Sequence, residues 1–184
     1  MNAARILKAN THQVFAAVLL LTLSASSALA ATREAEVKAA YLYKLASFVT
    51  WPGTAFTRAD QPFQICVAGR DDIFAILEVL IRSKQAAGHP MTAVYLGSKS
   101  AAQARNCHTL FVGQNVAGSR IMLASTARNP VLTVTDRSGG TSGGVIEFVE
   151  RDGNIRLAIR RQEADARQLG ISSKLLAVGE PVEP

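Results

Sequence analysis

The sequence predicts an α/β fold, a single three-layer domain in which a mostly parallel sheet carries helices on both faces and ends in an antiparallel C-terminal hairpin. The first observation is an apolar run, Phe63–Ala68, that Gly69 ends before a helical pattern opens at Asp71. The second is that strand-like and helical patterns alternate along most of the chain, as in sheets whose parallel strands are joined by helices. The third is Asp152-Gly153 between two strand-like runs, a strong hairpin signal.

Residues 1–30 have the three parts of a secretory signal peptide. Arg5 and Lys8 form a positive start, Val14–Leu23 is an apolar core, and Ala28-Leu29-Ala30 is an A-x-A cleavage site. The core is well short of the roughly 20 residues that a membrane-spanning helix needs. We therefore expect a cleavable signal peptide, residues 1–30, and one exported domain, residues 31–184, with no site for lipid attachment at the cleavage point.

The charge of the chain indicates a solvated surface. The formal charge of +6 falls to about +4 when Arg5 and Lys8 are removed with the signal peptide. The densest basic group is Arg156, Arg160 and Arg161, whereas a nucleic-acid-binding domain concentrates such charge on one face. We expect no nucleic-acid partner.

The domain is predicted to begin with a helix, Glu34–Val49, that stops before Thr50-Trp51-Pro52 because a residue preceding proline is disfavoured in the helical region. We expect Trp51 to pack in the core under the sheet edge, with an exposed partner contact as the alternative. The helix that opens at Asp71 follows, with apolar residues up to Ile81 on one face. After a break at Gly88-His89-Pro90, the central elements are strand Thr92–Leu96, a short helix Ala101–Arg105 capped by Ser98 or Ser100, strand Leu110–Val112, helix Arg120–Ala127 and strand Val131–Thr135.

The sequence pattern of the C-terminal part differs from that of the preceding residues. A glycine-rich loop, residues 139–144, precedes the two hairpin strands, Val145–Val149 and Ile155–Ile159. A helix is predicted over Gln162–Leu169, with Gly170 as its stop, and a second helical segment over residues 172–178.

Cys66 and Cys107 are the only cysteines, and an exported chain favours their pairing. A bridge is geometrically reasonable if their strands are neighbours, and it would close a loop of about 40 residues, worth about 4 kcal/mol in the chain-entropy model. Two buried free thiols are the alternative. A metal site that includes His108 has less support, because no further ligand cluster is present.

No catalytic constellation emerges from the sequence. Gly140–Gly144 matches the G-x-S-x-G pattern of a nucleophile elbow, but a strand follows it and no histidine occurs after His108. A dinucleotide site needs G-x-G-x-x-G after the first strand, where Asp71-Asp72 would repel a pyrophosphate. We therefore predict no enzyme, no cofactor and no metal.

Several separated segments of the chain together form a pattern typical of one protein family. They are VKAAYLYK from Val37 with FVTWP from Phe48, FQICVAG from Phe63, NCHTLFV from Asn106, PVLTVTD from Pro130 with Gly143-Gly144, and GISSKLL from Gly170. In these motifs the chain resembles the YfiR family of periplasmic proteins, over essentially the whole of residues 31–184.

The resemblance implies a periplasmic regulator. YfiR-type proteins bind the periplasmic sensor domain of an inner-membrane diguanylate cyclase and hold the cyclase off, which lowers cyclic-di-GMP and biofilm formation; an outer-membrane lipoprotein can sequester them. Cys66 and Cys107 match the family's cysteine pair between the first and third strands. The second pair of the prototype, in the hairpin region, is absent here, so redox control through that bridge is not carried over.

Two function hypotheses follow. The first is a repressor that binds the cyclase sensor domain, with an exposed apolar surface around Trp51 or on the terminal helix with Leu175 and Leu176. The predicted partners are that sensor domain, an outer-membrane lipoprotein and, in a homodimer, a second copy of the chain. The alternative is a periplasmic small-ligand-binding protein without a cyclase partner, with a pocket at the ends of the parallel strands where the helices begin.

Overall fold

The computed structural model describes residues 31–97 and 101–182. The predicted signal peptide, residues 1–30, and the predicted helix caps Ser98 and Ser100 lie outside the described residues. The chain divides into two units, Met1–Ala35 and Glu36–Pro184. A helix spans residues 31–45, and from Glu36 onward it belongs to the second unit, which is described here by itself.

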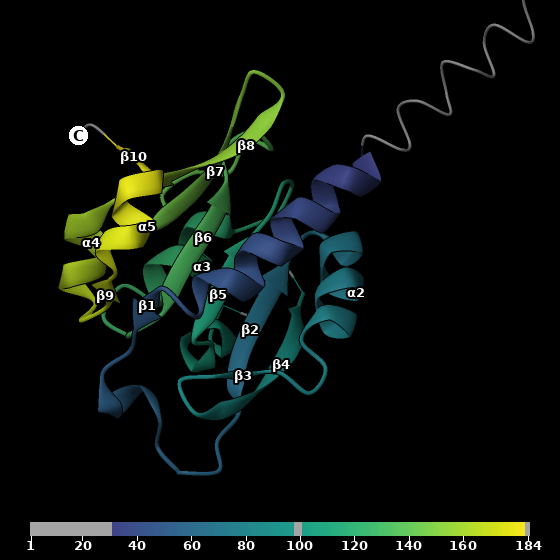
Figure 1. Ribbon diagram of the computed structural model, residues 1–184. Coiled ribbons are helices and arrows are strands. Elements are labelled where there is room, and N and C mark those ends of the chain that lie inside the picture. Colours follow the sequence, from purple (N-terminus) through teal and green to yellow (C-terminus); the bar gives the residue numbers. More distant parts are fainter. Residues whose placement is uncertain (1–30, 98–100, 183–184) are drawn as a thin grey trace, which may run out of the picture. The chain divides into compact units, whose positions relative to one another are not determined.

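The second unit is an α/β domain (Figure 1). Its strands are β1 (Val49–Thr50), β2 (Phe63–Ala68), β3 (Gln85–Ala86), β4 (His89–Leu96), β5 (Thr109–Val112), β6 (Leu132–Asp136), β7 (Ile146–Arg151), β8 (Asn154–Ile159), β9 (Gly170–Ile171) and β10 (Glu180–Pro181). Its further helices are α2 (Asp71–Leu80), α3 (Ser119–Ser125), α4 (Arg161–Ala166) and α5 (Ser173–Val178), with the 3₁₀ turns η1 (Gly53–Ala55) and η2 (Gln103–Asn106).

The sheet is mostly parallel. Among the described residues, eight strands pair in the order β10-β8-β7-β6-β5-β2-β4-β3, and β1 pairs with β9 in a separate two-stranded sheet. The neighbours from β4 through β2, β5 and β6 to β7 are parallel, whereas β7 and β8 are antiparallel. The predicted fold class is therefore confirmed.

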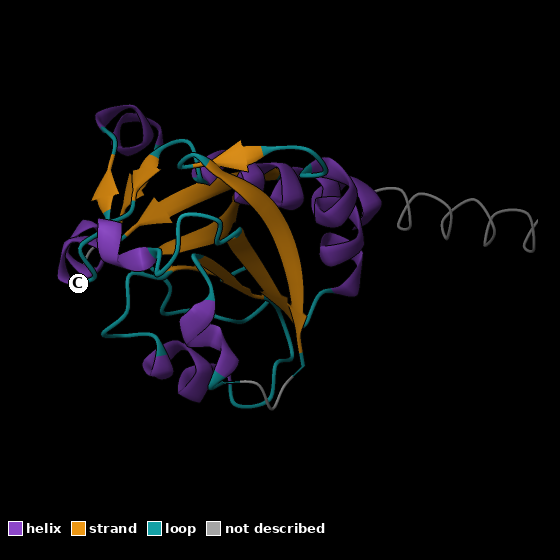
Figure 2. Cartoon of the chain, turned by 90° about the horizontal axis from the view of Figure 1, so that it is seen from below, coloured by secondary structure: helices purple, strands orange, loops and turns teal. Residues whose placement is uncertain are grey.

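Helices cover both faces of this sheet (Figure 2). Cys66 and Ala68 of β2 lie in one buried cluster with Leu110 of β5 and Met122 of α3. The intervening side chain Phe111 points to the other face, where it meets Phe148, which in turn contacts Tyr41 of the first helix. This alternation follows from the two-residue period of a strand.

Several predicted elements have the predicted bounds. β2 spans Phe63–Ala68, and α2 begins at Asp71 and is capped at Ile81. The hairpin turn lies between β7 and β8, where Asp152 and Gly153 have φ angles of 51° and 70°. Both central residues of the type I′ turn need such positive values, so this prediction is also confirmed.

Other predictions are wrong at element ends. The first helix ends at residue 45 and not at Val49, because Val49 pairs with Ile171 and Thr50 with Gly170. Gly170 therefore lies in a strand. His89-Pro90 does not break the chain but opens β4, and α4 ends before Gln168, whose φ of 60° leaves the helical region. The predicted short helix over Ala101–Arg105 is the 3₁₀ turn η2.

Candidate functional site

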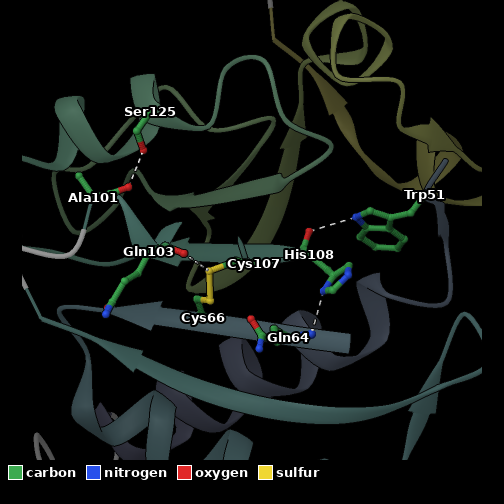
Figure 3. Close-up of a disulfide and its surroundings, with 8 residues drawn as sticks. All are labelled: Trp51, Gln64, Cys66, Ala101, Gln103, Cys107, His108 and Ser125. Carbon is green, nitrogen blue, oxygen red and sulfur yellow. Dashed lines mark hydrogen bonds between the residues drawn. A yellow bond between two sulfur atoms is a disulfide. The ribbon is translucent and has the colours of Figure 1, made fainter. Parts of the chain in front are cut away.

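A disulfide joins Cys66 of β2 to Cys107, immediately before β5 (Figure 3). The two Cα atoms lie 5.8 Å apart, and 41 positions separate the residues in sequence. The bridge forms because β2 and β5 are parallel neighbours, with Cys66 opposite Leu110. The predicted pairing is confirmed, and neither cysteine is a free thiol. It ties η2, which ends at Asn106, to the centre of the sheet.

The next residue, His108, connects three segments. Its Nδ1 accepts the backbone N–H of Gln64 at 3.0 Å (Figure 3). The proton of the neutral ring is therefore on Nε2, which donates to the carbonyl of Ala55 at 3.1 Å. The backbone carbonyl of His108 accepts the indole N–H of Trp51 at 3.1 Å. One buried histidine thus holds β2, η1 and the chain after β1 in place.

Aromatic rings surround this histidine. Phe56 lies between the rings of His89 and His108, with centroid distances of 3.9 and 4.4 Å. The His108 ring also stacks on Phe63 at 4.9 Å, and Trp51 meets Phe63 edge to face at 4.8 Å. Burial lowers the pKa of His108, and the nearby His89 lowers it further, against the opposing effect of the bond to Ala55. The arrangement favours the neutral ring.

Sequence reasoning missed this cluster. His89 and His108 have no nearby carboxylate in sequence, and Phe56 lies in a loop without a periodic pattern. The signal that could have found it is positional. Both histidines lie at or next to the starts of strands, β4 and β5, that flank β2 in a parallel arrangement, so their side chains meet at the same edge.

The residues predicted to bind a partner are unevenly exposed. Trp51 is 7% and Leu175 is 4% exposed, whereas Leu176 is half-buried. Burial in the core agrees with the packing role expected for Trp51. It does not test partner binding, and for all three residues that role stays a prediction.

The β1–β9 pairing brings the two predicted surfaces together. The chain at Val49–Thr50, next to Trp51, is paired with Gly170–Ile171, from which α5 starts. The N–H of Ser172 also donates to the carbonyl of Phe48, and the Ser172 hydroxyl caps α5 by accepting the N–H of Leu175. Phe48 and Val178 are 36% and 70% exposed in this region.

A pocket of about 480 Å³ opens at the amino ends of β2, β5 and β6. Its walls are the loop of residues 54–62, the end of η2 with Cys107 and His108, and residues 129–131. The small-ligand hypothesis predicted a pocket at the strand ends where the helices begin, which are the carboxyl ends. The observed pocket lies at the opposite ends of the strands.

Charged side chains fill the carboxyl ends. The Asp136 carboxylate lies 2.6 Å from Lys38 Nζ and 3.6 Å from Arg70 Nη1, and all three side chains are at most 9% exposed. Arg70 also covers Gly113, where an added Cβ would lie 2.6 Å from Arg70 Cγ. Its guanidinium pairs with Asp72 at 2.8 Å, and that hydrogen bond is the main reason that the pKa of Asp72 is lowered. The carboxyl ends of β2 and β6 therefore carry the protein's own ion pairs.

The glycine-rich loop makes structural contacts. The Thr141 hydroxyl donates to the carbonyl of Gly113 at 2.7 Å, and the N–H of Gly143 donates to the buried Glu147 at 2.7 Å. The loop leads into β7 and not into a helix, unlike a nucleophile elbow. Within residues 31–97 and 101–182, no three His, Cys, Asp or Glu side chains are grouped to hold a metal ion. None of the helices described there has the length and apolar character required to cross a bilayer.

A family model identifies the family of this chain. The model of the YfiR/HmsC-like family matches residues 35–180, which is most of the chain. The chain belongs to the YfiR/HmsC-like family. The resemblance inferred from the sequence is thereby confirmed. Among curated proteins, no sequence matches the chain. YfiR-like proteins are regulatory and not catalytic, and the Cys66–Cys107 bridge indicates an oxidising compartment.

Proposed function

We propose that this YfiR/HmsC-like protein is a periplasmic repressor that binds the sensor domain of an inner-membrane diguanylate cyclase. Binding would hold the cyclase inactive and lower cyclic-di-GMP signalling and biofilm formation. The observation that carries the proposal is the family match over residues 35–180, which spans the α/β domain. The disulfide supports it, because such bridges persist in oxidising compartments. The same proposal includes two further partners. One is an outer-membrane lipoprotein that sequesters the repressor, and the other is a second copy of the chain in a homodimer.

The partner surface proposed here lies around α5 and the β1–β9 pair. Val178 is 70% exposed and Leu176 is half-buried on α5, and the carbonyl of Phe48 accepts the N–H of Ser172, next to the start of that helix. Exposed apolar side chains of this kind are typical of protein contact sites. Leu175 on α5 and Trp51 next to β1 are buried, so neither offers much exposed area to a partner.

The test is capture of the cyclase from cross-linked cell envelopes with the tagged protein. We expect recovery of an inner-membrane protein with a cytoplasmic cyclase domain, and loss of at least about tenfold in recovery for Leu176→Asp and Val178→Asp, because a charge would enter an apolar contact. Ile121→Asp is the matched control: Ile121 is 69% exposed on α3, so its variant should capture as well as wild type.

Two results would contradict the proposal at different levels. Unchanged capture by the α5 variants would contradict the assignment of the partner surface but not the cyclase partner itself. Reproducible recovery of the tagged protein alone would remove the cyclase partner, and would turn attention to the alternative function, a small-ligand receptor, which the pocket beside the disulfide favours.

A further inference from the structure

We propose that the pocket at the amino ends of β2, β5 and β6 binds a small anion that carries carboxylate or phosphate groups. The pocket has a volume of about 480 Å³, within the range of roughly 300–1,000 Å³ that is usual for small-molecule sites. This inference concerns a different surface from the proposed cyclase contact and does not depend on it.

The walls of the pocket are held in place before any ligand arrives. The Cys66–Cys107 disulfide fixes the end of η2 to β2. His108 holds the loop of residues 54–62 through its bond to Ala55, and Phe56 of that loop is enclosed between two histidine rings. A wall that is already ordered loses little conformational entropy on binding, which favours affinity for a small ligand.

Positive charge lines the pocket from two sides. Arg58 comes from the loop and Arg105 from η2, and the described lining residues include no Asp or Glu. Arg105 Nε donates to the carbonyl of Ser125 at 3.1 Å, a bond that uses one of the five N–H donors of the guanidinium. Arg58 pairs with Asp60 at 2.9 Å, but both side chains are largely exposed, so this pair is weak and can yield to a ligand.

The remaining polar groups suit an anion with hydrogen-bonding oxygens. The amide oxygen of Gln61 accepts both the N–H and the hydroxyl of Thr57, which leaves the amide NH₂ as the donor of that side chain. Asn106 and Asn129 add further amides to the lining. Planar guanidinium groups bind carboxylate and phosphate in a bidentate manner, whereas a cation would be repelled by them.

The experiment is a titration of the ¹⁵N-labelled, oxidised protein with succinate and, separately, with inorganic phosphate, at constant ionic strength. We expect saturable shifts of the amides of residues 54–61, 105–108 and 131 with at least one probe. Arg105→Gln should weaken binding by about tenfold or more, because it removes a charge-assisted hydrogen bond. The arm that saturates at lower concentration identifies carboxylate or phosphate as the preferred group.

Arg156→Gln is the matched control, because Arg156 is an exposed residue of β8 outside the pocket and its substitution changes the net charge equally. Its binding should equal that of wild type. The proposal is overturned if neither probe produces saturable shifts in the pocket residues. It is equally overturned if Arg105→Gln and Arg156→Gln weaken binding to the same extent, since the anions would then follow the overall positive charge of the protein.

Discussion

At the scale of single residues, His108 shows how a titratable side chain can serve structure. Its two ring nitrogens have opposite roles, one accepting the Gln64 N–H and the other donating to the Ala55 carbonyl. A protonated ring carries N–H on both nitrogens, so it would turn the bond to Gln64 into a contact between two donors. The stacked rings of Phe56 and Phe63 also exclude water that would solvate the charge.

We predict that the protein loses stability as the pH falls below about 6.5. The pKa of His108 is lowered in the folded state, so the unfolded chain takes up a proton in this range that the folded protein does not. The free energy of unfolding therefore decreases with decreasing pH, from the unfolded pKa down to the folded one. Urea unfolding at about pH 7.5 and about pH 5.5 measures the change.

Two variants separate His108 from other titrating groups. In His108→Gln, the amide can still accept and donate, and the decrease between the two pH values should become smaller. In His89→Gln, the buried ring of His108 remains, so most of the decrease should persist. An unchanged decrease in His108→Gln would contradict the role given to this residue.

A second residue-scale prediction concerns the buried Lys38–Asp136 pair. Lys38→Met should destabilise the protein by about 3–5 kcal/mol, because it removes the nearest positive charge from a buried carboxylate. Lys38→Met combined with Asp136→Leu should lose less than the two single variants together, as a double-mutant cycle in urea would show. A single-variant loss below about 1 kcal/mol would contradict this prediction.

At the scale of elements, the disulfide joins a strand to a turn. Replacing both cysteines, Cys66→Ala with Cys107→Ala, should lower the free energy of unfolding by about 4 kcal/mol, since the loop that the bridge closes contains roughly 40 residues. Unfolding of the wild-type protein in reducing agent should give a similar loss, which controls for the two side-chain changes. Amide exchange should rise first in η2. Equal stability of the oxidised and reduced proteins would contradict the prediction.

Local sequence patterns predicted the elements that carry their own signal. β2, α2 and the Asp152-Gly153 turn each have a local sequence pattern that predicts them without reference to distant residues. The two-residue strands β1, β9 and β10 have no such pattern, because each exists only through its partner. The end of the first helix was mispredicted for the same reason: pairing with residues about 120 positions away outweighs the local preference.

At the scale of the whole α/β unit, the strand order explains why the candidate site could be predicted only in part. β2 has β4 on one side and β5 on the other, so the cysteine pair follows from topology once β5 is placed. Because the chain continues from β2 to β4 on one side and then to β5 on the other, the strand order reverses at β2. Ligands usually bind at the carboxyl ends of the strands beside such a reversal. Here the buried ion pairs of Arg70, Lys38 and Asp136 lie at the carboxyl ends. Neither their burial nor the pocket at the amino ends can be predicted from residue spacing or periodicity.

The pairing of early with late segments also has a consequence for when this protein can fold. Residues 49–50 find their strand partner at residues 170–171, and β8 receives its neighbour β10 at residues 180–181. A nascent chain on the ribosome therefore lacks a complete native state until almost all of it has been synthesised. On the export route that the proposed function implies, the chain would cross the membrane before these pairings can form. Its fold would then close after residues 170–181 have followed.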